Sequence, residues 1–567
     1  MAGTGASRGG PRADVAGGRA SDAGRALLGE HARRGRVRPV GPAGGARRGT
    51  RPRLPVLRPA TQRRQARPVE AARAVLDGPD GVHAAALRRG RRPGGDVQPH
   101  LPAPGRGRAD EDRSGGVRQN GGGIMTAAAT RRQVLQGAGA LAGLAALARP
   151  RPAAAASRAP NVIIVYCDDM GYGDLSCYGS PLIRTPVVDR LAAGGMRFTT
   201  MYSASPLCTP SRAALLTGCY APRVNLPLVL DPRDTNGLAP SEVTLAEYLR
   251  DAGYATACIG KWHLGEPARF RPDKQGFDRF YGLLGSNDWN PRPALYDGDQ
   301  IIENPADQPT LTRRYTEQAV SFVRDHADRP FFLYLAHTMP HEPLAVEPAF
   351  AGRSAGGDYG DVIETVDHYL GVLLGELDVL GIRQDTMVIF TSDNGPWYVG
   401  GTGPFAGRKA ETYEGGMRVP FVVSWPGTVP AGVTYEEPAC MVDVLPTLAA
   451  LAGAGLRADR VIDGRDLSAA LLRAERVDRG DIFYYSRTDC NAVRRGQWKL
   501  HVKRFPGPYY TGRGFSATEE LPQLFDLDRD PEEAYDLSGR HPELVAALTA
   551  RIRKFDEDLK ADSAQRA

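Results

Sequence analysis

Lysine and long hydrophobic runs are both scarce in this chain of 567 residues. Only seven of its 72 Lys and Arg residues are lysine, so each lysine position is informative. The apolar run from Gly137 to Ala148 is shorter than the roughly 20 residues that a bilayer-spanning helix needs, and no later stretch is long enough. The sequence therefore predicts no stable membrane span.

Cysteine is also sparse, and its positions form no recognisable framework. None of the seven cysteines belongs to a pair of Cys-x-x-Cys units, which argues against a structural zinc site. Six of them could pair in an exported protein, but spacing alone gives no disulfide connectivity. The seven positions are Cys167, Cys177, Cys208, Cys219, Cys258, Cys440 and Cys490.

Acidic and aromatic residues are scarce in residues 1–124. This segment has 25 Arg and 10 acidic residues, a net charge of +15, so the remaining residues carry −8 of the chain's formal +7. Because the positive charge is confined there, we expect no nucleic acid partner. The segment is rich in Gly, Arg, Pro and Ala, so we expect it to be disordered, or not to be translated at all.

A second start follows at Met125. Arg131 and Arg132 precede the apolar run, and four alanines (153–156) follow it, which is the order of a signal peptide with paired arginines. We therefore predict a twin-arginine-type signal peptide over residues 125–157. The folded protein is then exported to the periplasm or secreted.

The remaining chain alternates short apolar runs with helical patterns, which predicts an α/β fold with a large, mostly parallel sheet between helices. After about Asp466, shorter alternating pieces predict a small antiparallel sheet with a closing helix. We divide the chain into a catalytic domain (158–465) and a C-terminal subdomain (466–567). The predicted strands of the large sheet are 161–166, 254–259, 330–336, 386–390 and 419–424, and its predicted helices are 187–193, 245–252, 315–326 and 361–380.

Polar side chains follow four of these strands, where functional groups gather in open α/β sheets. Asp168 and Asp169 end the first strand, and Asp393 and Asn394 end a later one. Three carboxylates and an amide oxygen suit a hard cation such as Ca²⁺, with Mg²⁺ as the alternative. Taken singly, these residues are also common turn formers.

Cys208 lies at the start of a predicted helix that ends at Gly218. Thr209 suits its N-cap and Pro210 its first turn. A helix N-terminus favours a bound anion, and Arg212 lies one turn further on. The pattern alone also fits a buried cysteine beside a helix start.

The stretch Cys208-Thr-Pro-Ser-Arg212, with Leu-Leu-Thr-Gly218 behind it, resembles the Cys-x-Pro-x-Arg signature of type I sulfatases in the alkaline phosphatase superfamily. The resemblance implies an alkaline-phosphatase-like fold. It also implies that a formylglycine-generating enzyme converts Cys208 to formylglycine. The expected reaction is hydrolysis of a sulfate monoester, such as an aryl sulfate or a sulfated glycan.

The same resemblance assigns the remaining site residues. In that family, the calcium ligands correspond to Asp168, Asp169, Asp393 and Asn394, with the modified Cys208 adding an oxygen. Segments 253–263 and 405–416 resemble the family's lysine segments, and Pro340-His-Glu-Pro343 fits its His-x-Pro, although His337 could also reach the site. The implied catalytic residues are Cys208, Arg212, Lys261, His263, His341 and Lys409.

The implied mechanism uses the hydrated aldehyde at position 208, one hydroxyl of which attacks sulfur. Lys409 and His341 hold the ester and protonate the leaving alcohol, and His263 then takes a proton from the other hydroxyl as sulfate leaves. Two of the seven lysines fall at matched positions, where a compact ammonium group cannot be exchanged for a planar guanidinium.

Several alternatives remain open at this level. A phosphate or phosphonate monoester hydrolase of the same superfamily would share these groups, and so would a non-catalytic sulfoglycan-binding relative. Ser286 is either a substrate contact or a plain loop serine. Ala406-Gly-Arg408 stands where some animal relatives have a cysteine, so no disulfide is carried over. The pocket rim is expected from loops 225–236, 286–299 and 505–518.

Overall fold

The computed structural model describes residues 159–504 and 519–566. The predicted disorder of residues 1–124, the predicted signal peptide over 125–157 and the expected rim loop 505–518 lie outside the described residues. Within the described part, no helix is both long and apolar enough to cross a membrane.

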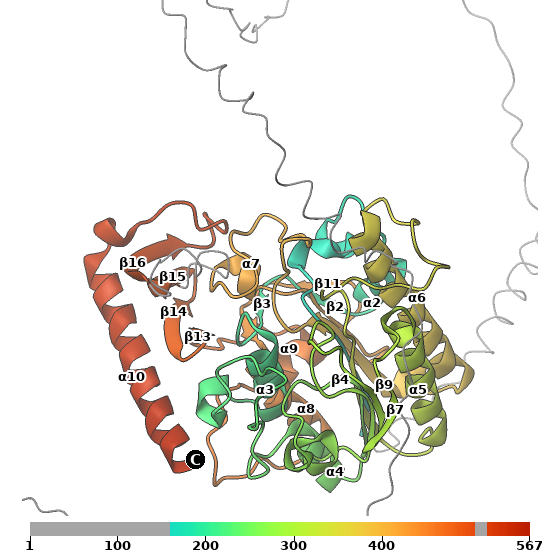
Figure 1. The fold of residues 1–567 in the computed structure, drawn as a ribbon. Helices are drawn as coiled ribbons and strands as arrows, with labels where there is room; N and C mark the ends of the chain where they lie inside the picture. Colours follow the sequence, from blue (N-terminus) through green and yellow to red (C-terminus); the bar gives the residue numbers. More distant parts are fainter. Residues whose placement is uncertain (1–158, 505–518, 567) are drawn as a thin grey trace, which may run out of the picture. The chain divides into compact units, whose positions relative to one another are not determined.

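A ten-stranded mixed sheet forms the centre of the fold (Figure 1). Strands β9, β1, β8, β4 and β5 are parallel neighbours, while β10 pairs antiparallel with β9. The predicted mixed, mostly parallel sheet is thus confirmed. In sheet order the strands are β11 (Val433–Tyr435), β2 (Met196–Phe198), β10 (Phe421–Ser424), β9 (Thr386–Ser392), β1 (Asn161–Cys167), β8 (Phe331–Ala336), β4 (Ala255–Lys261), β5 (Arg279–Leu283), β6 (Leu295–Asp297) and β7 (Gln300–Glu303).

Two hydrophobic cores lie on opposite faces of this sheet, because successive side chains of a strand point to opposite sides. Val162, Ile164 and Tyr166 of β1 enter one core, while Ile163 and Val165 enter the other. The first core includes α3 (Cys208–Thr217), α4 (Leu245–Asp251), α8 (Val444–Ala452) and α9 (Ser468–Arg473). The second includes α2 (Pro186–Ala193), α5 (Leu311–Asp325) and α6 (Gly357–Val379).

The predicted C-terminal antiparallel sheet is also confirmed. Its four strands, β13 to β16, pair in sequence order, and α10 packs against β14 and β15. Phe555 of this helix stacks on Phe483 of the sheet with ring centroids 3.8 Å apart. The bounds are β13 (Ile482–Ser486), β14 (Asp489–Arg495), β15 (Trp498–Arg504), β16 (Glu519–Asp526) and α10 (Pro542–Arg566); α7 (Glu414–Met417), β3 (Met201–Tyr202) and β12 (Ala439–Cys440) complete the named elements.

The sequence analysis did not find β2 and β11 on one side of the large sheet, or β5, β6 and β7 on the other. The β7 strand is largely exposed, so its residues show no buried alternation. Two helices also begin earlier than expected, at Leu311 and Gly357, because polar first turns weaken the apolar period there.

All seven cysteines are free thiols in the structure.

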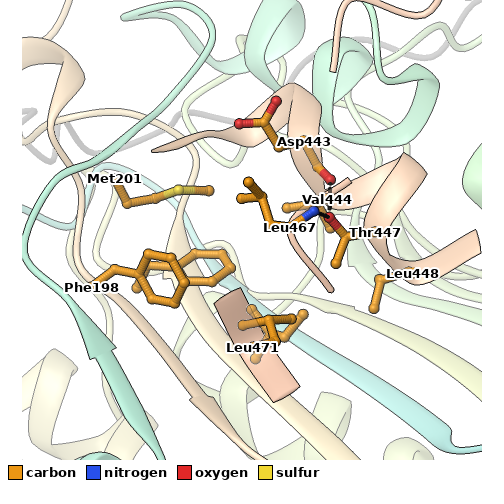
Figure 2. A pocket seen from close by; sticks show the side chains of 10 residues that line it. Phe198, Met201, Asp443, Val444, Thr447, Leu448, Leu467 and Leu471 are labelled. Atoms are coloured by element: carbon orange, nitrogen blue, oxygen red, sulfur yellow. Dashed lines mark hydrogen bonds between the residues drawn. The ribbon is translucent and has the colours of Figure 1, made fainter. Parts of the chain in front are cut away.

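A small cavity of about 20 Å³ lies within the first core (Figure 2). Its lining is apolar apart from Asp443 and Thr447, and both of these polar side chains are hydrogen-bonded to their surroundings. This volume has room for about one water molecule. We interpret the cavity as a packing defect rather than a ligand site.

Candidate active site

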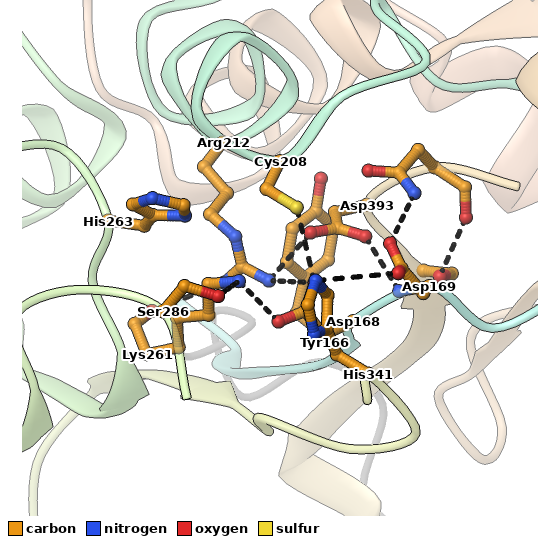
Figure 3. Close-up of polar contacts among 12 residues, drawn as sticks. Tyr166, Asp168, Asp169, Cys208, Arg212, Lys261, His263, Ser286, His341 and Asp393 are labelled. Carbon is orange, nitrogen blue, oxygen red and sulfur yellow. Dashed lines mark hydrogen bonds and ion pairs between the residues drawn. The ribbon is translucent and has the colours of Figure 1, made fainter. Parts of the chain in front are cut away.

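Four adjacent parallel strands bring their carboxyl ends to one edge of the sheet. The neighbours β9, β1, β8 and β4 end at or just before the acidic pairs, the His337 to His341 segment and Lys261. At Gly260 a Cβ atom would lie 1.8 Å from the Ala336 carbonyl oxygen, so only glycine lets β4 and β8 approach this closely. The predicted groups therefore converge (Figure 3).

The carboxylates of Asp168, Asp169 and Asp393 are buried beside one another. The Asp169 backbone N–H donates to Asp393 Oδ1 at 3.1 Å, and Asn394 Nδ2 donates to Asp169 Oδ1 at 2.7 Å. Asn394 Oδ1 is buried without a hydrogen-bond partner. Asp169 also has a φ of 63°, a conformation that non-glycine residues hold only where the surroundings enforce it.

Each carboxylate contacts a cationic side chain. Lys261 Nζ lies 2.5 Å from Asp168 Oδ2, and Lys409 Nζ lies 2.8 Å from Asp169 Oδ2. Arg212 Nη2 lies 2.7 Å from Asp393 Oδ2 and 3.4 Å from Asp168 Oδ1. The cluster is therefore a buried, nearly charge-balanced ionic centre.

Burial and pairing shift the acidities in this centre. Burial alone raises the pKa of Asp168, but Lys261 and Arg212 outweigh it and hold that pKa well below its usual range. Burial and the neighbouring Asp168 charge raise the pKa of Asp393 to about 7. Although burial opposes it, Asp169 raises the pKa of Lys409, so this lysine stays protonated at neutral pH.

Cys208 lies at the rim of the carboxylate cluster. Its Sγ is 3.5 Å from Asp168 Oδ1, and its side chain is buried. Burial raises the pKa of the Cys208 thiol well above its usual range, even though Lys261 and Lys409 favour the thiolate. The thiolate is the nucleophilic form of cysteine, so the unmodified side chain is a poor nucleophile.

The helix start differs from the prediction. Helix α3 begins at Cys208 with Leu207 as its N-cap, so the predicted N-cap at Thr209 is wrong. The Thr209 hydroxyl instead donates to the His263 carbonyl oxygen at 2.9 Å and accepts from the Leu230 N–H at 3.2 Å. The Thr209 hydroxyl thus makes tertiary hydrogen bonds instead of capping the helix.

The histidines separate into two sets. His341 Nε2 lies 3.6 Å from Asp169 Oδ2, and a ring nitrogen of His341 belongs with Asp168, Asp169 and Cys208 to a group of potential ligand atoms within 4.8 Å of one another. His337 is buried beside Tyr315 instead, and burial lowers its pKa to about 4. Of the two histidines that the sequence left open, His341 is thus the one at the cluster.

His263 lies on the other side of Arg212 (Figure 3). Its Nε2 is 2.9 Å from the Leu230 carbonyl oxygen, and its Nδ1 has no hydrogen-bond partner. Burial, reinforced by Lys261, lowers the pKa of His263 well below its usual range. Burial and the Lys409 charge likewise lower the pKa of His341.

The segment after β5, where the sequence left the role of Ser286 open, adds contacts to the site. Ser286 Oγ accepts from Lys261 Nζ at 3.1 Å, and Asn287 Nδ2 donates to the His341 carbonyl oxygen at 3.2 Å. Trp289 packs edge-on against His263, and a Cβ atom on Gly285 would overlap the Trp289 ring. The sequence analysis named Ser286 and the rim loop 286–299 here, but it did not predict the contacts of Asn287 and Trp289.

Together, a buried oxygen-rich cluster, a ring of cations and two neutral histidines beside a helix N-terminus can hold an anionic ester and transfer protons to it. The α/β fold and this site are typical of a hydrolase of anionic esters.

Comparison with known proteins specifies this class further. A sulfatase family profile matches residues 160–454, and a profile of the C-terminal region of aryl-sulfatase matches residues 477–567. The chain belongs to the sulfatase family and is a sulfuric ester hydrolase.

Curated relatives match most of the described chain. Human arylsulfatase A is 40% identical over 443 residues, which cover 70% of this chain and 87% of the relative. Mouse steryl-sulfatase is 35% identical over 536 residues, which cover 73% of this chain and 85% of the relative. Dog N-acetylgalactosamine-6-sulfatase is 37% identical over 455 residues, which cover 72% and 86%.

Solved structures share the fold of this chain, and one of them is named as a sulfatase. A sulfatase from Pseudoalteromonas sp. superposes with a TM-score of 0.66 at 28% identity, covering 77% of this chain and 95% of that one. Ps i-CgsB, solved in complex with a neocarrahexaose, superposes with a TM-score of 0.63 at 29% identity, covering 70% and 93%.

Proposed function

We propose that Cys208 is converted to formylglycine and that its aldehyde hydrate supplies the nucleophile for sulfate ester hydrolysis. The observation that carries this proposal is the position of Cys208 Sγ, 3.5 Å from Asp168 among the paired cations. As a buried neutral thiol, the unmodified side chain is badly suited to attack. The hydrate of an aldehyde offers one hydroxyl for attack and another for release of the product.

We further propose that Asp168, Asp169, Asp393 and Asn394 hold Ca²⁺, with Mg²⁺ as the alternative. Three buried carboxylates and the unpartnered Asn394 Oδ1 form the all-oxygen donor set that such ions prefer. Asn394 now points its amide nitrogen at Asp169, and a flip of the amide would turn the oxygen there instead. When bound, the cation would neutralise anionic charge and polarise the oxygen at position 208.

The chain's own cations then bind the ester and manage its protons. Lys261 and Lys409 are charged groups in a site shielded from water, where they stabilise charge that develops on sulfate oxygens. Lys409 and His341 lie together on the Asp169 side, where both would hold the ester oxygen. Lys409 is charged and His341 neutral, so Lys409 would supply the proton to the leaving alcohol. Arg212 orients Asp168 and Asp393.

His263 is the proposed general base. Its lowered pKa keeps the imidazole neutral at neutral pH, so its ring can accept a proton. The Leu230 carbonyl oxygen is hydrogen-bonded to His263 Nε2, so Nδ1 is the ring nitrogen that can accept a proton. Removal of a proton from the second hydroxyl at position 208 would allow sulfate to leave.

For the substrate, we propose an aryl sulfate or a sugar sulfate. The relatives are named as arylsulfatase, steryl-sulfatase and N-acetylgalactosamine-6-sulfatase, and one solved neighbour is in complex with a neocarrahexaose. A phosphate or phosphonate monoester hydrolase and a non-catalytic sulfoglycan-binding protein are the competing functions. A panel of aryl sulfate, aryl phosphate and sulfated sugars, assayed side by side, distinguishes these functions.

Mass spectrometry of the peptide that contains Cys208 tests the modification directly. We expect the mass of a side chain in which CHO replaces CH₂SH. A fully active protein whose peptide carries only the thiol would refute the proposal. A modified protein that cleaves aryl phosphate far faster than aryl sulfate would favour the competing hydrolase.

We also propose export through the signal at residues 125–157, preceded by modification in the cytoplasm by a formylglycine-generating enzyme. A twin-arginine route carries folded proteins, so the oxidation of Cys208 can come first. The support is the order of paired arginines, apolar run and alanines. Cell fractionation and N-terminal sequencing test it.

A further inference from the structure

The segment that carries Lys409 lies in an irregular stretch. Between the end of β9 at Ser392 and the start of α7 at Glu414, the chain forms no helix or strand. Yet Lys409 Nζ lies 2.8 Å from Asp169 Oδ2, and its side chain is almost buried. A long, flexible side chain on an irregular backbone keeps one position only if other parts of the fold support that backbone.

The residue after Lys409 shows where this support comes from. Ala410 has a φ of 77°, in the left-handed region that a non-glycine residue rarely occupies. Its N–H donates to the Pro206 carbonyl oxygen at 2.9 Å, two residues before Cys208. Its carbonyl oxygen accepts from Ser486 Oγ at 3.1 Å, at the end of β13. Both peptide groups that flank Ala410 are therefore fixed, one by the active-site side and one by the C-terminal sheet.

The next residues are also attached to the C-terminal region. The Tyr413 ring packs against His501 of β15 with centroids 4.8 Å apart, and its hydroxyl donates to Gln523 Oε1 at 3.2 Å. The Glu414 N–H donates to Glu533 Oε2 at 2.6 Å. The segment from Lys409 to α7 thus contacts β13, β15 and β16 of this sheet.

Buried charges make the attachment rigid. Lys499 Nζ of β15 lies between Glu414 Oε1 at 2.9 Å and Glu533 Oε1 at 3.0 Å. The side chains of Lys499 and both glutamates are fully buried. Separating such charges leaves each unpaired in a low dielectric, so the network resists rearrangement.

We propose that the C-terminal sheet orients Lys409 and that Ser486 is a positioning residue acting through the Ala410 carbonyl group. This inference rests on the proposed role of Lys409 in holding the sulfate ester. Ser486 touches no substrate. It fixes the peptide group between Ala410 and Glu411, and so supports the backbone that sets the direction in which the Lys409 ammonium group points.

The test is a double-mutant cycle between Ser486→Ala and Lys409→Ala in the full-length, formylglycine-containing enzyme. Steady-state kinetics on an aryl sulfate give kcat and KM for each variant, and thermal melting shows that each is folded. We expect Ser486→Ala to lower kcat/KM about tenfold in the native background, because small displacements of a catalytic group cost much rate. In the Lys409→Ala background the same change should have almost no effect.

Ser424→Ala is the matched control. Ser424 is as buried as Ser486, and its hydroxyl accepts from Arg383 at the far end of the large sheet. We expect its kcat/KM to equal that of the native enzyme. The inference is overturned if Ser486→Ala leaves kcat/KM unchanged, if its loss is the same in both backgrounds, or if Ser424→Ala causes an equal loss. If Lys409→Ala itself keeps native kcat/KM, the proposed role of Lys409 fails instead.

Discussion

Cys208 combines the burial of a core residue with the position of a catalytic group. A residue kept only for packing has no reason to lie 3.5 Å from a carboxylate that Lys261 and Arg212 already neutralise. At the residue scale, the proposal therefore depends on chemistry at this one side chain.

We expect Cys208→Ala to abolish sulfate ester hydrolysis while the fold stays intact. Alanine fits the buried position but cannot be oxidised to an aldehyde. Turnover of an aryl sulfate and circular dichroism measure the two properties. Cys177→Ala, at a half-buried cysteine, serves as the control and should keep full activity. Substantial turnover by Cys208→Ala would show that the assignment is wrong.

The proposed metal site can be tested by removing the ion and by changing one of its ligands. A chelator is expected to lower both the activity and the thermal midpoint, because binding to the native state alone stabilises it. Added Ca²⁺ should restore both. In Asp393→Asn, which removes one proposed ligand charge, the thermal midpoint should no longer respond to Ca²⁺. An unchanged response in that variant would exclude Asp393 as a ligand.

At the scale of elements, the start of α3 connects three parts of the site. The Thr209 hydroxyl joins the helix to the backbone of His263 and to Leu230, whose carbonyl in turn contacts the His263 ring. Helix, strand end and loop are therefore held together by one side chain.

We expect Thr209→Val to lower kcat/KM about tenfold, because this isosteric change frees the backbone that places His263. The stability loss should be modest, at about 1–2 kcal/mol. Thr217→Val, on the same helix, removes only local bonds to Ala213 and Cys219 and should leave kinetics unchanged. Equal kinetic effects of the two variants would argue against this link.

The connection between α7 and β15 should be visible in the pH dependence of stability. Burial alone raises the pKa of Glu414, but Lys499, Arg418 and Arg494 outweigh it and lower the pKa from 4.5 to about 2. Because the folded pKa lies below the unfolded one, this stabilisation is complete above pH 4.5. It is lost as pH falls toward 2.

We expect Glu414→Gln to cost about 3–5 kcal/mol at pH 7, because it removes the charge that faces Lys499. Between pH 6 and 3.5, its free energy of unfolding should fall less steeply than that of the native protein. Urea unfolding at several pH values measures both effects. Glu475→Gln, at an exposed ion pair with Arg473, should leave both the stability at pH 7 and its pH dependence nearly unchanged. If the free energy of unfolding of Glu414→Gln fell with pH as steeply as that of the native protein, the pKa shift assigned to Glu414 would be contradicted.

At the scale of the whole molecule, the charge of the chain is unevenly distributed. Residues 1–124 carry +15 and residues 125–157 add four arginines without an acidic residue, so residues 158–567 carry a formal −12. If the signal is cleaved as proposed, the exported protein is acidic although the full sequence is basic.

We therefore expect the exported protein to begin near residue 158 and to bind an anion exchanger at pH 7. N-terminal sequencing and the elution position check both expectations. The intact chain of 567 residues, with its net +7, would bind a cation exchanger instead. Finding residues before Met125 in the cellular protein would contradict the proposed second start.

The sequence alone was enough for the central strands of the sheet and for the groups at their carboxyl ends. Buried strands such as Asn161–Cys167 are nearly continuous apolar runs, and the polar residues after them mark the strand ends. These signals are local, because they depend on the side chains of adjacent residues. The same locality explains why the fold class and the positions of the main helices could be read directly.

Only the tertiary structure could decide which distant groups meet. It replaced the Thr209 cap by a bond to His263, placed His341 rather than His337 at the carboxylates, and brought Ser286, Asn287 and Ser486 against the site or its supports. Each of these choices joins residues far apart in the chain. Such contacts depend on how strands and loops pack in space, which no local pattern of residues records.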